Sequence, residues 1–132
     1  MELRTFVLFI KSEFDMKKLL FDKMVFHSGL NFTVRAGVKW ASLIPGELIT
    51  IGNQFAEIDM IYICRFDDIP FSVYLNEHDP KCQDGDGDPN ELLIELKRIY
   101  PNGNWDSGKQ IVTCIGFHFR GDIIHAGRKI NM

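Results

Sequence analysis

The sequence predicts one α+β domain in which two main helices pack on a small, mixed, barrel-like β-sheet. The chain has 132 residues, the usual size of a single domain. Predicted strands outnumber helices and lie in runs, whereas a doubly wound fold requires regular alternation. With 45% hydrophobic and 12% aromatic residues, the chain can build a core. We therefore expect a single domain over residues 1–132.

The N-terminal quarter is predicted to contain a strand, a helix and a second strand. Leu3–Lys11 is rich in β-branched and aromatic residues, which favours a strand. A helix is predicted to follow and to run to about His27. Its N-cap is Ser12 or Asp15, and mostly apolar side chains recur at three- and four-residue spacing. Asn31–Arg35 is predicted to form a short strand.

The middle of the chain is predicted to contain the clearest strands. Lys39–Leu43 is predicted to form a turn of helix. Strands are then expected at Glu47–Gly52 and Ile58–Phe66, joined by a hairpin loop around Asn53-Gln54. Both faces of the second strand are apolar, which favours a central position in the sheet. One face is expected to carry Ile58, Met60, Tyr62, Cys64 and Phe66.

The C-terminal half is predicted to alternate between polar and apolar segments. A short segment at Phe71–Leu75 leads into Asn76–Asn90, which is polar and is predicted to be a loop. A helix is expected from about Glu91 to Tyr100, because its leucines and isoleucines fall on one face. Gln110–Phe119 is a strongly predicted strand. The tail at 121–132 is expected either to add a strand or to fray.

Charge and cysteine content limit the function and the compartment. The net charge is −3 and the pI about 5.8, which argues against binding nucleic acid through a broad basic face. Three cysteines without a CxxC pair favour a reducing compartment. The apolar run at Phe6–Ile10 is too short for a signal sequence or a membrane span. We therefore expect a cytoplasmic protein that does not associate with membranes.

A series of segments resembles the ASCH group of the PUA-like superfamily. Thr33–Gly52 (TVRAGVKWASLIPGELITIG) is similar to its T-x-R element, which is followed by a Pro-Gly-acidic turn and a barrel strand. CRFDDIP, NEHDPKC, ELLIELKRIYP and IVTCIGFHF, which follow in this order, also resemble the family. The resemblance covers about residues 29–119. It implies a small β-barrel with a cleft beside its helices, and a ligand that is RNA or a modified nucleoside.

Enzymes of this family imply a catalytic set. The amidohydrolases that cleave N4-acetylcytidine place a Lys three residues before the Thr of T-x-R, and a Glu in a later loop. Here Leu30 occupies the Lys position, and we expect Lys39 to reach the same pocket from the other side of the turn. The resemblance therefore implies Thr33, Lys39 and Glu77 as catalytic residues, in which the amine activates the hydroxyl oxygen.

Side chains suited to nucleotide binding gather within Thr33–Trp40. Thr33 and Arg35 share one face of the predicted strand, because side chains alternate. The fork of Arg35 suits a phosphate or a base edge, Lys39 offers a mobile cation, and Trp40 offers a stacking plane. The alternative is an exposed Arg and Lys beside a core Trp. The candidate ligand-binding residues are Arg35, Trp40, Tyr62 and Arg65.

Two metal patterns are incomplete, and no metal or cofactor is predicted. Asp84, Asp86, Asp88 and Glu95 match the acidic positions of a calcium loop, but Pro89 stands where that loop requires Gly. Cys114 and His118 lie four residues apart in one predicted strand, which separates them by about 13 Å. That is too far for two ligands of one zinc ion.

Three functions remain open at this stage. The first is capture of a nucleotide or of single-stranded RNA in the cleft. The second is hydrolysis of a modified nucleoside or of RNA by Thr33, Lys39 and Glu77. The third is a module that binds a protein partner, such as a small inhibitor, which the acidic pI and Leu30 favour.

Overall fold

A computed structural model describes residues 16–83 and 89–121. The predicted strand at Leu3–Lys11 and the tail at 122–132 lie outside the described residues. Neither α-helix in the described part of the chain is long and apolar enough to span a lipid bilayer. The elements in chain order are β1 (Asn31–Ala36), β2 (Leu48–Ile51), β3 (Gln54–Arg65), a 3-10 turn (Phe66–Asp68), α2 (Phe71–Leu75), a 3-10 turn (Pro80–Cys82), α3 (Pro89–Ile99) and β4 (Ile111–Arg120).

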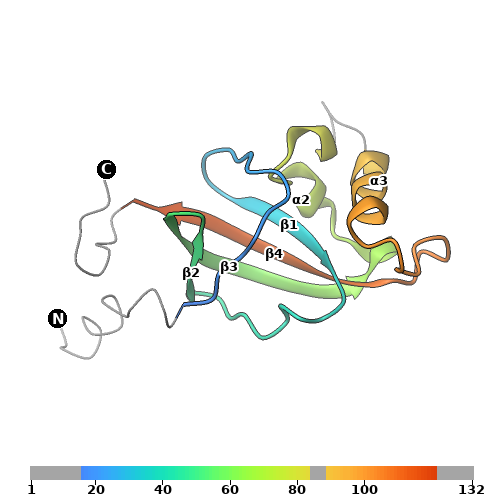
Figure 1. Cartoon of the computed structure of the whole chain (residues 1–132), viewed down its shortest axis with the longest axis horizontal. Helices are drawn as coiled ribbons and strands as arrows, with labels where there is room; N and C mark the ends of the chain where they lie inside the picture. The colour runs from blue at the N-terminus through green and yellow to red at the C-terminus, as the bar shows by residue number, and fades with distance from the viewer. Residues whose placement is uncertain (1–15, 84–88, 122–132) are drawn as a thin grey trace.

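The four strands form one curled sheet in the order β1-β4-β3-β2, a half-barrel with the helices at one end (Figure 1). Every strand pairing within it is antiparallel. Parallel contacts are confined to isolated bridges that flanking segments make with the two edge strands. The predicted α+β class and barrel-like sheet are confirmed, as is the central position of β3. The expectation of a mixed sheet is wrong, because neighbouring strands of the described sheet all run antiparallel. The strand predictions at β1, β2, β3 and β4 are also confirmed within one to four residues.

The predicted hairpin between β2 and β3 is confirmed, but its turn is tighter than predicted, since Gln54 already belongs to β3. Ile51 pairs with Gln54, which leaves only Gly52 and Asn53 in the loop. Gly52 has a φ of +62°, in the left-handed region that side chains with a Cβ rarely adopt. Two-residue hairpins use such a conformation at their first loop position, and glycine adopts it at little cost.

A β-bulge in β3 alters the predicted alternation. Ile58 lies opposite Phe117, but Met60 lies opposite the adjacent Gly116, so Asp59 is an extra residue without a partner. The predicted common face of Ile58 and Met60 is therefore wrong. Ile58 faces one core cluster, and Met60 packs against the other.

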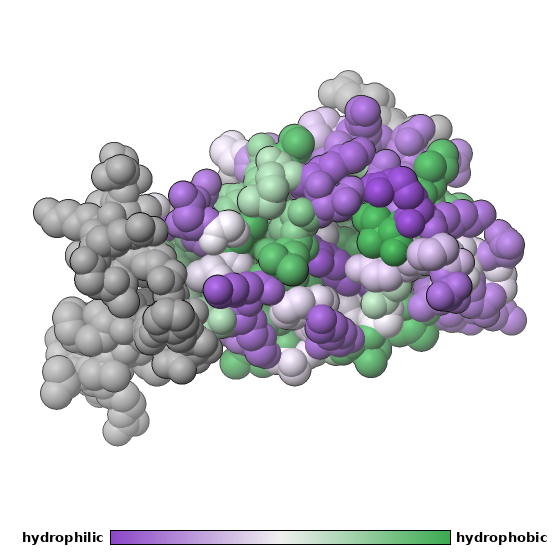
Figure 2. All heavy atoms as spheres, viewed as in Figure 1, coloured by the Kyte–Doolittle hydropathy of each residue, from purple (hydrophilic) through white to green (hydrophobic). Residues whose placement is uncertain are grey.

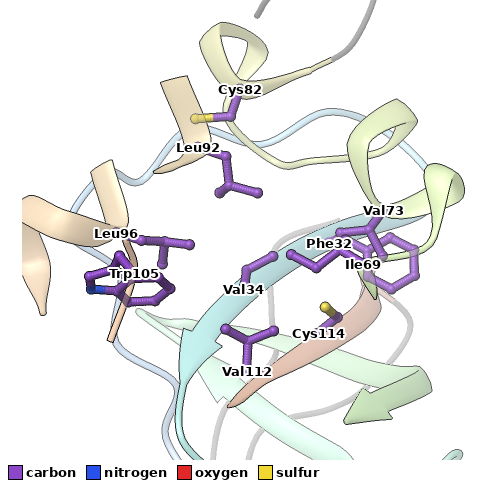
Figure 3. Packing of buried hydrophobic residues seen from close by; sticks show 10 residues of the cluster. All are labelled: Phe32, Val34, Ile69, Val73, Cys82, Leu92, Leu96, Trp105, Val112 and Cys114. Carbon is purple, nitrogen blue, oxygen red and sulfur yellow. The ribbon is translucent and has the colours of Figure 1, made fainter. Parts of the chain in front are cut away.

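Two hydrophobic clusters cover the two sides of the sheet. The helix-side cluster packs α3 and the α2 region onto β1 and β4, with the leucines of α3 directed at the valines of the strands (Figure 3). The strap-side cluster lies on the opposite side. The helix-side cluster contains Phe32, Val34, Ile69, Val73, Cys82, Leu92, Leu96, Trp105, Val112 and Cys114. The strap-side cluster contains Leu19, Leu43, Ile49, Ile51, Ala56, Ile58, Ile115 and Phe117.

Residues 16–27, which we call the strap, are extended, and the predicted helix is therefore wrong over this range. The strap begins at the edge of β2, where Leu19 N donates to Thr50 O at 3.0 Å. It then crosses the face of the sheet toward the helices and β1 (Figure 1). The rings of Phe21 and Phe26 pack against Phe117 at centroid distances of 5.8 and 6.1 Å. Burial on the sheet thus overrides the local helical spacing.

The outer side of the strap carries apolar side chains that the sheet does not cover. Leu20 is 77% exposed, Met24 56% and Val25 45%. Figure 2 shows this face of the molecule, where hydrophobic side chains form separate patches among hydrophilic ones. Burial alternates from Leu19 to Met24, with Leu19 inside and Leu20 outside, which is the pattern of an extended segment on a sheet.

Candidate functional site

A pocket of about 130 Å³ lies beside β1, between the strap, the loop after α2 and helix α3. A cavity of about 150 Å³ is large enough for benzene, so this pocket has room for one ring. Leucines from the strap and α3 form the apolar part of its wall. Its polar lining includes Lys23, Thr33, Arg35, Glu77, His78 and Asp79.

Arg35 enters this pocket from β1, as its predicted role requires. Its Nε donates to Thr33 Oγ1 at 3.1 Å, because the two side chains share one face of the strand. Its guanidinium lies over the ring of Phe21, 4.7 Å from the centroid, which is a cation–π distance. Burial lowers the pKa of Arg35 from its ordinary value, although Tyr100 and Glu77 oppose that shift. It remains a fixed cation, because arginine keeps its proton in proteins.

Glu77 is the buried acid of the pocket, with only 3% of its surface exposed. The backbone around it extends the edge of β1, since His78 N donates to Phe32 O at 2.9 Å. Its Oε1 lies 3.4 Å from His78 Nε2, while its Oε2 has no hydrogen-bond partner among the described residues. Burial raises the pKa of Glu77 to about 8. The carboxyl group is therefore mostly protonated at neutral pH.

His78 is the partner of Glu77 in this contact. Its Nδ1 lies 2.8 Å from Val25 O and donates to that carbonyl, which leaves Nε2 as an acceptor toward Glu77. Burial lowers the pKa of His78, so the neutral ring is favoured. Phe21 and Phe26 pack against the imidazole at 4.9 and 5.4 Å. With the Glu77 proton directed at His78 Nε2, the pair leaves Glu77 Oε2 as an acceptor for a guest.

A network of ion pairs ties the strap to the pocket rim. Lys23 Nζ lies 3.5 Å from Asp79 Oδ2 and 3.2 Å from Glu95 Oε1. Arg98 contacts Glu95 at 2.7 Å and also pairs with Asp22 of the strap. Sequence reasoning missed Lys23 as a pocket residue, because it placed this residue on a helix. The only cue in the sequence was that Lys23 lies close to Phe21 in the chain, and this does not predict where its side chain points.

Four of the predicted site residues do not line the pocket. Lys39 is exposed and lies over the ring of Trp40, 5.4 Å from its centroid, and Trp40 packs against the strap-side cluster. Tyr62 stacks on Phe32 and donates to the sulfur of Met60. The structure therefore brings Thr33, Arg35 and Glu77 together, and places Lys39, Trp40 and Tyr62 elsewhere. Arg65 is exposed and pairs with Asp68 at 3.0 Å.

The charges around the pocket favour an uncharged guest. Among its lining residues, four carboxyl groups face two cations, Lys23 and Arg35. Both acidic neighbours of Lys23 already neutralise it. With Glu77 protonated, the carboxylates of Asp22, Asp79 and Glu95 are balanced by Lys23, Arg35 and the rim residue Arg98, so a phosphate would meet no surplus of positive charge. A neutral polar ring would meet donors, acceptors and aromatic surface.

Together these observations define an α+β protein with a curled antiparallel sheet and a ring-sized pocket beside β1. No family model, curated protein or solved structure matches the chain.

Proposed function

We propose that this chain is an ASCH-like, PUA-like domain that binds a single uncharged nucleobase or nucleoside in the pocket beside β1. The observation that carries the proposal is Glu77, a buried carboxyl whose second oxygen lacks a partner among the described residues, in the wall of a ring-sized pocket. Buried polar groups in folded proteins are nearly always satisfied. A ligand with a polar edge satisfies this one.

The remaining lining residues suit the faces and edges of such a ring. Phe21 offers an aromatic surface, and the Arg35 guanidinium beside it offers donors in a fixed plane. Bases of single nucleotides are recognised by stacking and by hydrogen bonds to their edges. Phe21 thus takes the stacking role that the sequence assigned to Trp40 and Tyr62.

The same pocket disfavours an RNA strand as ligand. Asp22, Asp79 and Glu95 lie around its rim, and the whole chain carries a net charge of −3. Affinity for a nucleic-acid backbone comes mainly from cations that neutralise phosphates. We therefore narrow the predicted ligand from RNA or nucleotide to nucleoside or base. All three cysteines are free thiols, which supports a reducing compartment such as the cytoplasm.

Calorimetric titration with nucleosides, their 5′-monophosphates and a short single-stranded RNA tests this proposal. We expect at least one nucleoside to bind at least tenfold more tightly than its monophosphate, with no measurable RNA binding. Arg35→Gln and Glu77→Met should each weaken nucleoside binding at least tenfold, because each removes a polar partner that the pocket offers. Arg65→Gln is the matched control, because Arg65 is exposed and lies outside the pocket. Equal binding by all three variants and the parent would refute the site.

A hydrolase is the second candidate, and the Thr33–Arg35 contact favours it. Arg35 donates to the Thr33 hydroxyl oxygen at 3.1 Å, so a cation lies where a threonine alkoxide would form. Glu77 and Lys23 line the same pocket, and in this second proposal Lys23 would act in place of Lys39 once its pairing with Asp79 and Glu95 is released. Thr33→Val and Lys23→Met should then abolish turnover of N4-acetylcytidine, while Lys39→Met leaves it unchanged.

The two candidates and the third possibility separate cleanly in one experiment. An enzyme releases acetate from N4-acetylcytidine, and Thr33→Val retains binding but not release. A binding module gives no release in any variant. If neither binding nor release occurs, the chain is better explained as a protein-interaction module, and capture of a partner from its native host is the next measurement.

A further inference from the structure

We propose that Glu57, Asp59 and His118 form a binding site for a divalent transition-metal ion, with Zn²⁺ the tightest-bound of the common candidates. These three residues lie on β3 and β4, separate from the pocket beside β1. One donor atom from each lies within 4.8 Å of the other two. The site is independent of the proposed nucleoside function.

The strand register explains why three distant residues meet. Glu57 and His118 are direct partners across β3 and β4, and the bulge inserts Asp59 just after them. An unbulged strand would pair residue 59 directly with β4, whereas here it is an extra residue that the ladder leaves free. Bulges are over-represented beside functional sites, where they redirect a side chain. This one adds a second carboxylate to the Glu57–His118 pair.

The distances between the donors fit a metal ion after a small adjustment. His118 Nδ1 lies 2.9 Å from both oxygens of Asp59, so these donor atoms already converge. Zinc binds imidazole nitrogen and carboxylate oxygen at about 2.0–2.2 Å in a tetrahedral arrangement, so two of its ligands stand about 3.4 Å apart. Donors within 4.8 Å of one another need to close by up to about 1.4 Å, which rotation of the half-buried side chains would supply.

Arg120 occupies the position of an outer partner to the metal ligands. It donates to Glu57 Oε1, which leaves Oε2 of the same carboxylate for an ion. Ligating carboxylates in metalloproteins commonly accept such a hydrogen bond, which fixes their orientation. The carboxylates of Glu57 and Asp59 and the guanidinium of Arg120 sum to one negative charge. A bound divalent ion would therefore leave this group with a smaller net positive charge than it would beside neutral ligands alone.

The open side of this group faces a hollow on the molecular surface. The hollow has a volume of about 420 Å³, and both Asp59 and His118 line it together with residues 27–30 and Phe119. All three proposed ligands are half-buried. Three protein ligands plus an open position for water are the arrangement of catalytic rather than structural zinc sites. The remaining coordination position therefore faces solvent or a small exogenous ligand.

The ligand types decide which ion fits. An imidazole nitrogen with two carboxylates suits zinc, manganese, iron or cobalt, whereas calcium and magnesium prefer oxygen ligands only. Affinity among these divalent ions rises toward zinc. We expect Zn²⁺ to bind more tightly than Mn²⁺ and Ca²⁺ not to bind detectably.

Titration of the chelator-treated full chain with Zn²⁺, Mn²⁺ and Ca²⁺ tests the site, with heat and melting temperature as readouts. We expect one equivalent of Zn²⁺ per chain and a raised melting temperature. Asp59→Asn and His118→Gln should each weaken Zn²⁺ binding at least tenfold. Asp106→Asn is the matched control, because the Asp106 side chain is 95% exposed and lies outside the group. Melting without metal checks that each variant is folded.

Cobalt substitution distinguishes metal binding at this site from metal binding by the three cysteine thiols. Co²⁺ held by nitrogen and oxygen lacks the sulfur charge-transfer absorption that a cysteine ligand produces. We expect visible d–d bands without that absorption, and we expect His118→Gln to remove them. The proposal is overturned if Zn²⁺ does not bind, if Asp59→Asn and His118→Gln bind it like the control, or if the cobalt spectrum shows cysteine ligation.

Discussion

The two sides of the curled sheet are covered in different ways. On the helix side, α3 places Leu92 and Leu96 on β1 and β4, and its own apolar periodicity predicts both its conformation and its buried face. On the strap side, residues 16–27 bury Leu19 and Phe26 with the same kind of apolar content but no helix. The comparison teaches that apolar side chains at three- and four-residue spacing can be buried either by a helix or by a segment that lies along a sheet. The surface available for burial decides which conformation forms.

A matched pair of Leu→Ala variants gives the largest expected effect. Leu96 on α3 is 2% exposed and Leu19 on the strap is 1% exposed. Burial of this degree predicts a loss of about 2–5 kcal/mol in the free energy of unfolding for either change. Chemical denaturation measured by tryptophan fluorescence checks both values. Equal losses would show that the strap is a full structural layer rather than a loose cover.

The neighbouring leucine is the control for this pair. Leu20 is 77% exposed, so Leu20→Ala should change the free energy of unfolding by less than about 0.5 kcal/mol. A loss at Leu19 no larger than this control, with the full loss at Leu96, would contradict the view that both sides of the sheet are equally packed.

This contrast also explains how much of the fold the sequence predicted. β3 and β4 were found because each is a long apolar run that no helix of similar length would bury as well. The bulge at Asp59 was not, because nothing in local alternation distinguishes an inserted residue from a paired one. The strap was mistaken for a helix, because its conformation comes from the sheet it crosses rather than from its own propensities.

The candidate site follows the same division. Thr33 and Arg35 were predicted correctly to share a strand face, and their side chains meet in the pocket. Glu77 also lines it, and the structure buries this residue although it lies in a segment that was predicted to be a polar loop. The position of Lys23 at the pocket depends on where the strap crosses the sheet. The distance between Lys39 and the pocket depends on the path of a loop. Neither can be derived from spacing along the chain.

Glu77 gives the second prediction, a pH dependence that tests the pocket wall formed by the loop after α2. The folded-state pKa of Glu77 is about 8, above its ordinary value of 4.5, so folding retains a proton that the unfolded chain releases. This contribution to stability is complete below pH 4.5 and is lost as the pH rises toward 8. Glu77→Gln should therefore be nearly neutral at pH 5 and stabilising by on the order of 3 kcal/mol at pH 8.

Denaturation at several pH values, with Asp106→Asn as control, measures this difference. His78 acts in the opposite direction, because its lowered pKa makes stability fall as the pH drops below its ordinary value of 6.5. That dependence should persist in Glu77→Gln. A constant difference between parent and variant from pH 5 to pH 8 would show that Glu77 is ionised throughout.

Lys23 gives the third and smaller effect, on the attachment of the strap to the pocket rim. Lys23→Met removes the ion pairs with Asp79 and Glu95 and leaves Asp79, which is 6% exposed, without this cation. We expect a small loss in the free energy of unfolding, because the lysine is one-third exposed and only its partner Asp79 is well buried. The loss should shrink at high salt. Lys17→Met is the control, since the Lys17–Glu47 pair is 3.6 Å long and more exposed.

Thiol labelling sharpens the comparison without changing stability. Cys82 and Cys114 belong to the helix-side cluster, and burial raises the pKa of both, to about 12 for Cys82. Alkylation of these thiols should be slow in the folded protein, because the thiolate is the reactive form. Cys64, which is only half-buried, should react first. Mass spectrometry after timed alkylation gives the three rates, and denaturant should equalise them.

The strap side has no native cysteine among the residues of its cluster, so Ala56→Cys supplies the matching probe. Ala56 is 0% exposed on β3, and Cys114 is equally buried on the other side of the sheet. If the strap is an integral layer, the introduced thiol reacts as slowly as Cys114, because both require global unfolding. Faster reaction at position 56, with Cys114 still protected, would mean that the strap detaches on its own. The pocket would then have one movable wall, since Phe21 and Lys23 would leave with the strap.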